Sequence, residues 1–247
     1  MLPIEMALET ALLVIQNGGS TGAADRSLAN ILKGWKTDGV SVIWRLDFVA
    51  VTTTVEGRSS TSLRSVGPIG VNLVRAAAAT LLAERVAQGD LDVAAVGTEI
   101  ARIRNLPAPY NRAVMTAAAA CAGAAFSQVS GGDWGSLAIA FVAAGAGQLL
   151  RSALQARKVA VAPVTLMCGA LSAGIAAIGL RFGVTQTAGA ALIASVIYVV
   201  PGLPLINGFI DVASHKHLFV GIQRIANATF LFVVIAFAIV LALTVFV

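Results

Sequence analysis

Residues 198–211 read YVVPGLPLINGFID, and they lie within a long apolar stretch of the chain. Pro201 cannot donate a hydrogen bond to the carbonyl four residues before it, and its ring clashes with that carbonyl. Gly202 permits most backbone angles, and Pro204 suits the first position of a new helix. The sequence therefore predicts a helix that unwinds at 201–203, inside the bilayer, and restarts at Pro204.

The unwound segment carries polar backbone groups, which at membrane depth are tolerated only where protein buries them or where they line a cavity. Free amides at the start of the new helix favour a carboxylate, and unpaired carbonyls at 197–200 favour an ammonium group. Broken helices of this kind mark substrate sites in secondary transporters. We predict a substrate site made of Pro201, Gly202, Leu203, Pro204 and Asn207, with Tyr198 and Arg224 as supporting residues.

Asp211 lies four residues after Asn207 on the same helical face, and it is the only acid in or near the last three apolar segments. A carboxylate within a membrane is a functional candidate, here as a proton carrier or as the partner of an amine. The alternative is a boundary charge at the cytoplasmic end, paired with Lys216 or Arg224. Both interpretations stay open at this point.

Hydrophobic residues make up 57% of the 247 residues and charged residues 12%, which is about half the charge of soluble domains. Five apolar segments are long enough, or nearly so, to cross a membrane: 113–129, 134–150, 159–180, 186–210 and 221–247. The predicted fold class is an α-helical membrane protein with five transmembrane helices, the fourth one broken, plus an N-terminal cytoplasmic α/β domain. The predicted domains are 1–106, the cytoplasmic domain, and 107–247, the five-span transmembrane domain.

The charges are distributed unevenly along the chain. Residues 1–106 hold ten acids and ten bases, whereas 107–247 hold two acids and seven bases. Most bases precede the first span, and the second loop holds Arg151, Arg157 and Lys158. The first loop has none, the third has only Arg181, and the fourth has Lys216, with Arg224 just inside the last span. The positive-inside rule then predicts a cytoplasmic N-terminus and an outside C-terminus in the plasma or inner membrane. Because these bases lie at span ends rather than on one face, the pattern argues against nucleic-acid binding.

The N-terminal 106 residues have the patterns of a soluble domain. Apolar residues at helical spacing predict a first helix that Gly18 and Gly19 end, and a second helix over 23–36. Alternation at 40–46 and a β-branched run at 48–55 predict two strands, and a turn at Glu56-Gly57-Arg58 leads to a third strand over 61–66. Helices over 71–88 and 91–105 follow, and Asp90 or Asp92 can cap the second of them.

The GGSTG run around Ser20 fits G-x-S-x-G, the nucleophile elbow of hydrolases, but that elbow needs a strand before the serine. A helix precedes it here, and the two histidines, His215 and His217, are far away in the sequence. The end of one helix and the cap of the next explain the run, so we predict no enzyme activity and keep a Ser20 hydrolase as a third interpretation. Cys121 and Cys168 lie in apolar runs without metal-ligand spacing, so no metal or cofactor is predicted.

The order of these features resembles the threonine/serine exporter family, specifically its larger N-terminal half, over nearly the whole chain. The similarity is carried by the glycine-punctuated opening helices, the strand pair at 40–55, Gly70-Val71-Asn72-Leu73, residues 107–112, and Val200-Pro201-Gly202 followed by Asn207, Asp211, Gly221 and Arg224. The last string is the most specific. One departure is that members carry Gly-Ala…Arg-x-Glu in the opening helices, whereas residues 21–28 read TGAADRSL, without the glutamate. Any role that this pattern has in the family is therefore not transferred to this chain.

The resemblance implies proton-driven export of small hydroxy amino acids, threonine and serine, or of dicarboxylates such as succinate. It also implies ten spans in total, so that this chain assembles with a second, smaller membrane subunit, with a homo-oligomer as the other assembly. An odd number of spans in each half gives the two halves opposite orientations, an inverted repeat.

Two functions from different classes remain. The first is a subunit of a proton-coupled secondary transporter, whose partners are a small-molecule substrate and the lipid bilayer. The second is a non-transporting membrane scaffold or sensor with a ligand-binding cytoplasmic domain. The second predicts a fully packed spanning region, so a pocket lined by Asn207 and Asp211 counts against it.

Overall fold

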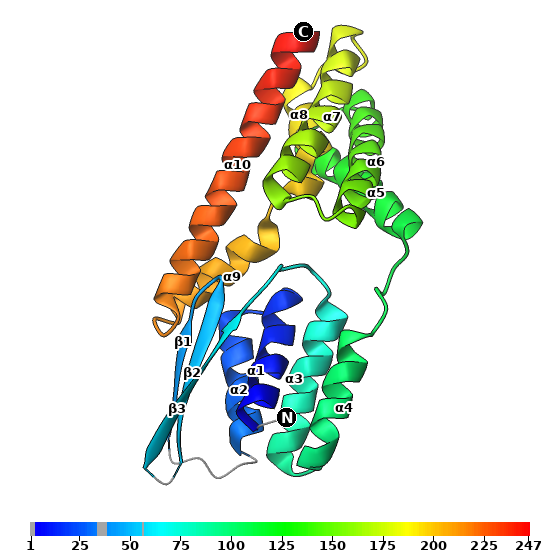
Figure 1. The fold of residues 1–247 in the computed structure, drawn as a ribbon. Helices are drawn as coiled ribbons and strands as arrows, with labels where there is room; N and C mark the ends of the chain where they lie inside the picture. Colours follow the sequence, from blue (N-terminus) through cyan, green and yellow to red (C-terminus); the bar gives the residue numbers. More distant parts are fainter. Residues whose placement is uncertain (1–2, 34–38, 56) are drawn as a thin grey trace. The chain divides into compact units, whose positions relative to one another are not determined.

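The computed structural model describes residues 3–33, 39–55 and 57–247 of the chain. It is mostly helical, with one small three-stranded sheet (Figure 1). Contacts group the chain into two compact units. The first unit comprises Met1–Pro109 and Gly202–Ala226, and the second comprises Tyr110–Pro201 and Asn227–Val247. The segment after the Pro-Gly pair is therefore grouped with the N-terminal part, and the division into domains 1–106 and 107–247 stays a prediction.

Four helices of the N-terminal part enclose the core of the first unit: α1 (Pro3–Gln16), α2 (Thr21–Lys33), α3 (Leu73–Gln88) and α4 (Val93–Arg104). Residues such as Leu8, Leu28 and Ile100 are almost fully buried there, as their helical spacing predicts. Asn72 and Asp92 cap α3 and α4 with their side chains, so the second of the two predicted aspartate caps is the one used. Residues 34–36 of the predicted second helix lie outside the described residues.

The sheet of the first unit is an antiparallel meander of β1 (Gly39–Trp44), β2 (Phe48–Val55) and β3 (Arg58–Ser65). Its central strand buries Val49 and Val51 completely, while β3 is almost entirely exposed. The predicted third strand begins too late, because Val55 pairs directly with Arg58. Gly57 has a φ of +75°, which suits a tight turn, and Glu56, the first residue of the predicted turn, lies outside the described residues.

The second unit is built from helices: α5 (Arg112–Val129), α6 (Trp134–Ala156), α7 (Val161–Arg181), α8 (Ala188–Val196), the single 3₁₀ turn η1 (Ile197–Val199) and the later part of α10 (Leu218–Phe246). Small residues allow these helices to approach closely. A Cβ on Gly123 of α5 would lie 2.9 Å from the Cβ of Ala144 and 3.2 Å from the carbonyl oxygen of Ala194. This is the packing mode expected of helices in lipid.

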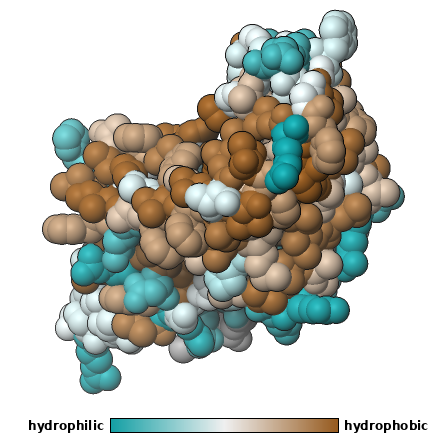
Figure 2. All heavy atoms as spheres, turned by 90° about the horizontal axis from the view of Figure 1, so that it is seen from above, coloured by the Kyte–Doolittle hydropathy of each residue, from teal (hydrophilic) through white to brown (hydrophobic). Residues whose placement is uncertain are grey.

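Three helices, α6, α7 and α10, are long and apolar enough to cross a membrane, and a fourth span is added if α8 with η1 and α9 (Gly202–Ala213) form one bent span. This count rests on length and composition and covers the described part of the chain. Helix α5, with 18 residues, is not among them. On α10 the large apolar side chains of Phe230, Val233 and Phe237 are more than half exposed. Hydrophobic residues also cover most of the face shown in Figure 2, as expected of a surface that lies in lipid or against another subunit.

Candidate functional site

The helix that contains the Pro-Gly pair is broken, as the sequence predicts. After η1 the backbone of Val200 is extended, with φ −60° and ψ 129°, and α9 begins at Gly202. The break therefore covers Val200 and Pro201, earlier than the predicted 201–203, because glycine and proline are both tolerated in the first turn of a helix. The sequence predicts a restart at Pro204 and hence free amides in the turn after it, whereas α9 starts at Gly202, so the amides without an intrahelical acceptor belong to Gly202 and Leu203.

Tyr198, just before the break, is anchored between α6 and α7. Its hydroxyl lies 3.0 Å from the hydroxyl of Ser172 and donates to the carbonyl of Cys168 at 3.3 Å. Gly147 makes room for it, because a Cβ at that position would lie 1.8 Å from the Tyr198 hydroxyl oxygen. Tyr198, which the sequence marks as a supporting residue, is thus held by polar contacts in the interior of the second unit.

Arg151 is a residue of this region that the sequence reasoning missed. It lies within α6, and its guanidinium donates to the carbonyl of Tyr198 at 2.8 Å. One of the carbonyls predicted to attract a substrate ammonium group is therefore already paired. A cation here also suits the C-terminal end of the α8–η1 segment, where the helix dipole is negative. The signal that could have found it is its position six residues before Arg157, which places it inside the helix rather than in the predicted loop.

Asn207 and Asp211 lie on the buried face of α9, within the first unit. The Asn207 side chain donates to the carbonyl of Gly18 at 2.9 Å. The hydroxyl of Thr21, at the start of α2, donates to Asp211 Oδ2 at 2.7 Å. The four-residue spacing thus places both polar side chains against the α1–α2 connection, while the neighbouring Ile206 is 58% exposed on another face of α9.

Arg224 of α10 completes what we name the Asp211 cluster: Thr21, Asp211 and Arg224. Its Nε lies 3.2 Å from Asp211 Oδ2, and its Nη2 lies 3.4 Å from the Thr21 hydroxyl. The Asp211 and Arg224 side chains are 1% and 3% exposed. Of the two partners considered for Asp211, the structure pairs it with Arg224. Asp211 Oδ1 is buried and has no hydrogen-bond partner among the described residues, so this carboxylate retains unused acceptor capacity.

Two glycines allow the approach of α9 and α10 on which the Asp211 cluster depends. A Cβ on Gly221 would lie 2.7 Å from the backbone nitrogen of Val212 and 2.8 Å from the carbonyl oxygen of Gly208. A Cβ on Gly208 would in turn lie 2.9 Å from Ile225. Ordinary Cβ contacts are longer, so only glycine fits at these crossing points. This close packing explains why glycine occupies position 221, one of the positions that carry the resemblance to the exporter family.

Ser20 has a structural role in the described part of the chain. Its hydroxyl accepts from the amide of Ala23 at 3.2 Å, which is the N-cap contact of α2. Gly18 has a φ of +94°, and the Gly19 amide donates to the carbonyl of Val14 at 2.9 Å, as in a helix C-cap. The helix-end explanation of the GGSTG run is therefore confirmed.

A second polar cluster in the second unit surrounds Asp133, the N-cap of α6. Its Oδ1 accepts from the Ser136 amide at 2.7 Å and from the Thr185 hydroxyl at 2.5 Å, and its Oδ2 accepts from the Gln186 amide at 2.8 Å. The hydrogen bond from Thr185, followed by those from Gln186 and Ser136, holds the pKa of Asp133 well below its ordinary value. Asp133 thereby ties the α5–α6 loop to the α7–α8 loop.

Replacing Asp133 by asparagine is expected to lower the thermal unfolding temperature at neutral pH, because an amide cannot accept all three hydrogen bonds. A depressed pKa contributes stability above the unfolded-state value, and this contribution is lost as the pH falls toward the folded-state value. The difference between variant and wild type should therefore shrink below about pH 3.8, the ordinary value. Thermal unfolding in detergent at pH 7 and pH 3 tests this, with the exposed Asp47→Asn as control. A difference in unfolding temperature that is the same at pH 7 and pH 3 contradicts the lowered pKa of Asp133.

The chain is similar to known proteins over nearly its whole length. Residues 5–246 match the family ThrE, described as "Putative threonine/serine exporter". The chain is 23% identical over 240 residues to the "Probable succinate transporter subunit YjjP" of Klebsiella aerogenes, covering 97% of this chain and 92% of the relative. It is 25% identical over 246 residues to the protein of the same name from Escherichia coli K12, covering 97% and 93%. No solved structure matches the chain. Since the family match spans nearly every residue, the chain belongs to the ThrE threonine/serine exporter family.

Proposed function

We propose that this protein is one subunit of a secondary transporter that exports a small carboxylate, either threonine or serine or a dicarboxylate such as succinate, in exchange for protons. The observation that carries the proposal is the buried ion pair between Asp211, on the helix that restarts after the Pro-Gly break, and Arg224 of α10. Family membership and the names of the two relatives support solute transport as the class of activity. Succinate is named for those relatives and is a proposal for this chain.

The proposed architecture has five spans, with α5 as the first of them. Its 18 residues extend about 27 Å, close to the ~30 Å of a hydrocarbon core. The N-terminus is then cytoplasmic and the C-terminus outside, in the inner membrane, as the distribution of basic residues suggests. A second, smaller membrane subunit completes a ten-span unit, and the word "subunit" in the names of both relatives supports such a partner.

The proposed coupling uses the exchange of partners at Arg224. While Asp211 is ionised, its carboxylate neutralises the Arg224 guanidinium, and the buried pair has no net charge. When Asp211 takes up a proton, Arg224 loses its counter-ion and accepts the carboxylate of the substrate instead, a pairing that guanidinium geometry favours. Release of the substrate allows Asp211 to give up the proton and to pair with Arg224 again. The rest of the proposed substrate site is formed by Asn207, by Pro201 at the break, and by Gly202, Leu203 and Pro204 in the first turn of α9.

The competing function, a membrane scaffold or sensor, treats the same pair as a purely structural contact that holds α9 and α10 against α2. One observation supports this alternative. The hydrogen bonds of Asn207 and Thr21 and the ion pair of Asp211 with Arg224 all lie within the first unit. This alternative predicts that substitutions at Asp211 affect stability alone and that no solute moves.

Replacing Asp211 by asparagine is expected to abolish proton-dependent efflux while the protein still folds, because the amide keeps the shape of the carboxylate but cannot carry the proton. The measurement is efflux of succinate, threonine and serine from loaded cells that express the chain with its native partners, with and without a protonophore. Asp47→Asn, at an exposed position, is the matched control. Normal protonophore-sensitive efflux by a folded Asp211→Asn variant removes Asp211 from the mechanism.

A further inference from the structure

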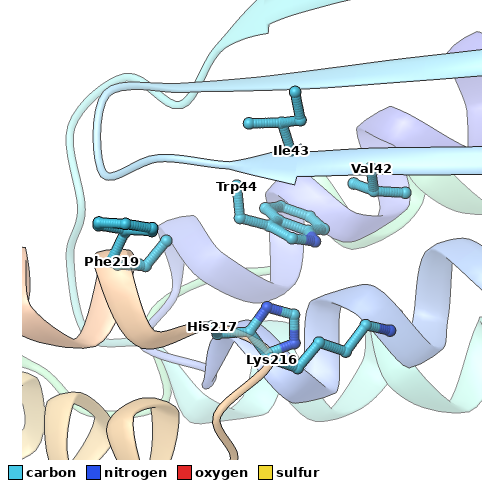
Figure 3. A pocket seen from close by; sticks show the side chains of 7 residues that line it. Val42, Ile43, Trp44, Lys216, His217 and Phe219 are labelled. Atoms are coloured by element: carbon cyan, nitrogen blue, oxygen red, sulfur yellow. The ribbon is translucent and has the colours of Figure 1, made fainter.

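A pocket of about 190 Å³ lies within the first unit, where β1 meets the α9–α10 loop and the start of α10 (Figure 3). Its apolar walls come from Val42 and Trp44 of β1 and from Phe219 and Val220 of α10. Its polar side is formed by Lys216 and His217. Figure 3 shows the side chains of Trp44 and His217 facing one another across the space.

His217 is the most informative of these groups. Its side chain is only 5% exposed and lines the pocket, yet the imidazole makes no hydrogen bond with any residue in the described ranges. The nearest carboxylate oxygen, Asp25 Oδ2, is 3.9 Å from Nε2, which is beyond hydrogen-bond distance. Burial lowers the pKa of His217, so the ring is neutral at neutral pH and offers one donor and one acceptor. The imidazole lines the pocket with its donor and its acceptor unused, so both are available to a ligand there.

The charges around the pocket favour an anion. Both oxygens of Asp25 are occupied, Oδ1 by the Trp44 indole N–H at 3.0 Å and Oδ2 by the Lys216 ammonium at 2.5 Å. The ammonium of Lys216 has three donors and its side chain is 69% exposed, so donors remain for a ligand. The guanidinium of Arg45 lies 5.7 Å from the centroid of the Phe219 ring. Lys216 lines the pocket and Arg45 lies over its wall residue Phe219, so with Asp25 these three groups carry a net charge of +1.

We propose that this pocket binds a small monocarboxylate with a short, branched alkyl chain, as a cytosolic effector and not as the transported solute. The carboxylate is received by Lys216 and His217, and the alkyl chain packs between Val42, Trp44 and Phe219. The volume of about 190 Å³ suits a small ligand rather than a drug-sized one. A dicarboxylate fits poorly, because the walls beyond the two polar groups are apolar.

The position of the pocket links its occupant to the Asp211 cluster. Thr21 and Asp25 are four residues apart on α2, so they share one face, and both contact the α9–α10 segment. Lys216 lies in the chain between Asp211 and Arg224. A ligand held by β1 and by the α9–α10 loop therefore stabilises the docking of that segment on α2. Because it binds the docked arrangement, it also raises the apparent stability of the protein.

The test measures equilibrium binding of isovalerate to the full chain purified in detergent, by titration calorimetry and by the shift in thermal unfolding temperature. Isovaleramide, which has the same shape without the charge, is the control ligand. We expect isovalerate to bind and the amide not to bind. Lys216→Gln should weaken binding by about tenfold or more, because a charge-assisted contact is lost. Val42→Phe should abolish binding by filling the pocket, and the exposed Lys158→Gln should leave it unchanged.

Absence of isovalerate binding overturns the proposal, and so does equal affinity for the acid and the amide. Binding that is the same in wild type, Lys216→Gln and Val42→Phe shows that the ligand lies elsewhere, which also overturns it. Val42 is partly exposed on its strand, so Val42→Phe keeps the test valid if Lys216→Gln does not fold. The measurement involves no transport, so its outcome is independent of the efflux experiment on Asp211.

Discussion

Replacing Arg224 by glutamine is expected to destabilise the protein by about 3–5 kcal/mol, because it leaves the Asp211 carboxylate buried without a counter-ion. The thermal unfolding temperature should fall by roughly 10 °C. Thermal unfolding in detergent measures this effect, and Arg157→Gln, at the exposed C-cap of α6, is the matched control. The control should change the free energy of unfolding by less than about 0.5 kcal/mol.

The double variant Asp211→Asn/Arg224→Gln separates the structural role of the pair from its role in transport. Both buried charges are absent, so most of the lost stability should return, in the way that neighbouring residues couple in double-mutant cycles. Transport should not return, because neither the proton site nor the substrate-binding cation is present. Efflux by a stable double variant contradicts the proposed coupling, and an unfolding temperature of Arg224→Gln equal to that of wild type contradicts the buried ion pair itself.

Gly221→Ala is the second substitution with a large expected effect. The added Cβ lies 2.7 Å from the Val212 nitrogen and 2.8 Å from the Gly208 carbonyl oxygen, so backbone atoms of α9 must move. Overpacking of this kind costs about 1–3 kcal/mol and more where backbone is displaced. Because α9 and α10 carry Asp211 and Arg224, their separation also breaks the ion pair. We therefore expect reduced thermal stability together with loss of efflux.

Gly97→Ala is the matched control for Gly221→Ala. Gly97 also lies within a helix of the first unit, α4, but a Cβ there meets no atom within 4 Å. Alanine favours a helix over glycine by up to about 1 kcal/mol, so this variant should be as stable as wild type or more stable. If Gly221→Ala unfolds at the same temperature as Gly97→Ala, the close approach of α9 and α10 is not required for stability.

The elements that local sequence determines were predicted well. The antiparallel meander follows from the alternation at 40–46 and the β-branched run at 48–55, because side-chain period distinguishes a strand from a helix. The break follows from Pro201 and Gly202, since proline removes a backbone donor wherever it occurs in a helix. The break starts one residue earlier and ends two residues earlier than predicted, because glycine and proline both suit the first turn of a helix.

The partners of the polar side chains depended on contacts that sequence pattern does not report. Thr21 and Asp211 are 190 positions apart, and the sequence contains no sign that they form a hydrogen bond. Arg151 was assigned to a loop because its charge suggested a boundary, whereas packing of α6 beside η1 brings its guanidinium to the Tyr198 carbonyl. Two boundary bases of similar appearance, Lys216 and Arg224, were equal candidates for Asp211.

The sequence by itself determined the apolar helices, the sheet and the interruption at the Pro-Gly pair, because each follows from composition and from periodicity over a few consecutive residues. The family was indicated by the resemblance of particular motifs. Only the tertiary structure decided that Asp211 pairs with Arg224 and that Lys216 instead pairs with Asp25. The reason is physical. Two charges of opposite sign attract whatever their separation along the chain, and only the packing of α2, α9 and α10 determines which pair is brought within contact distance and shielded from water.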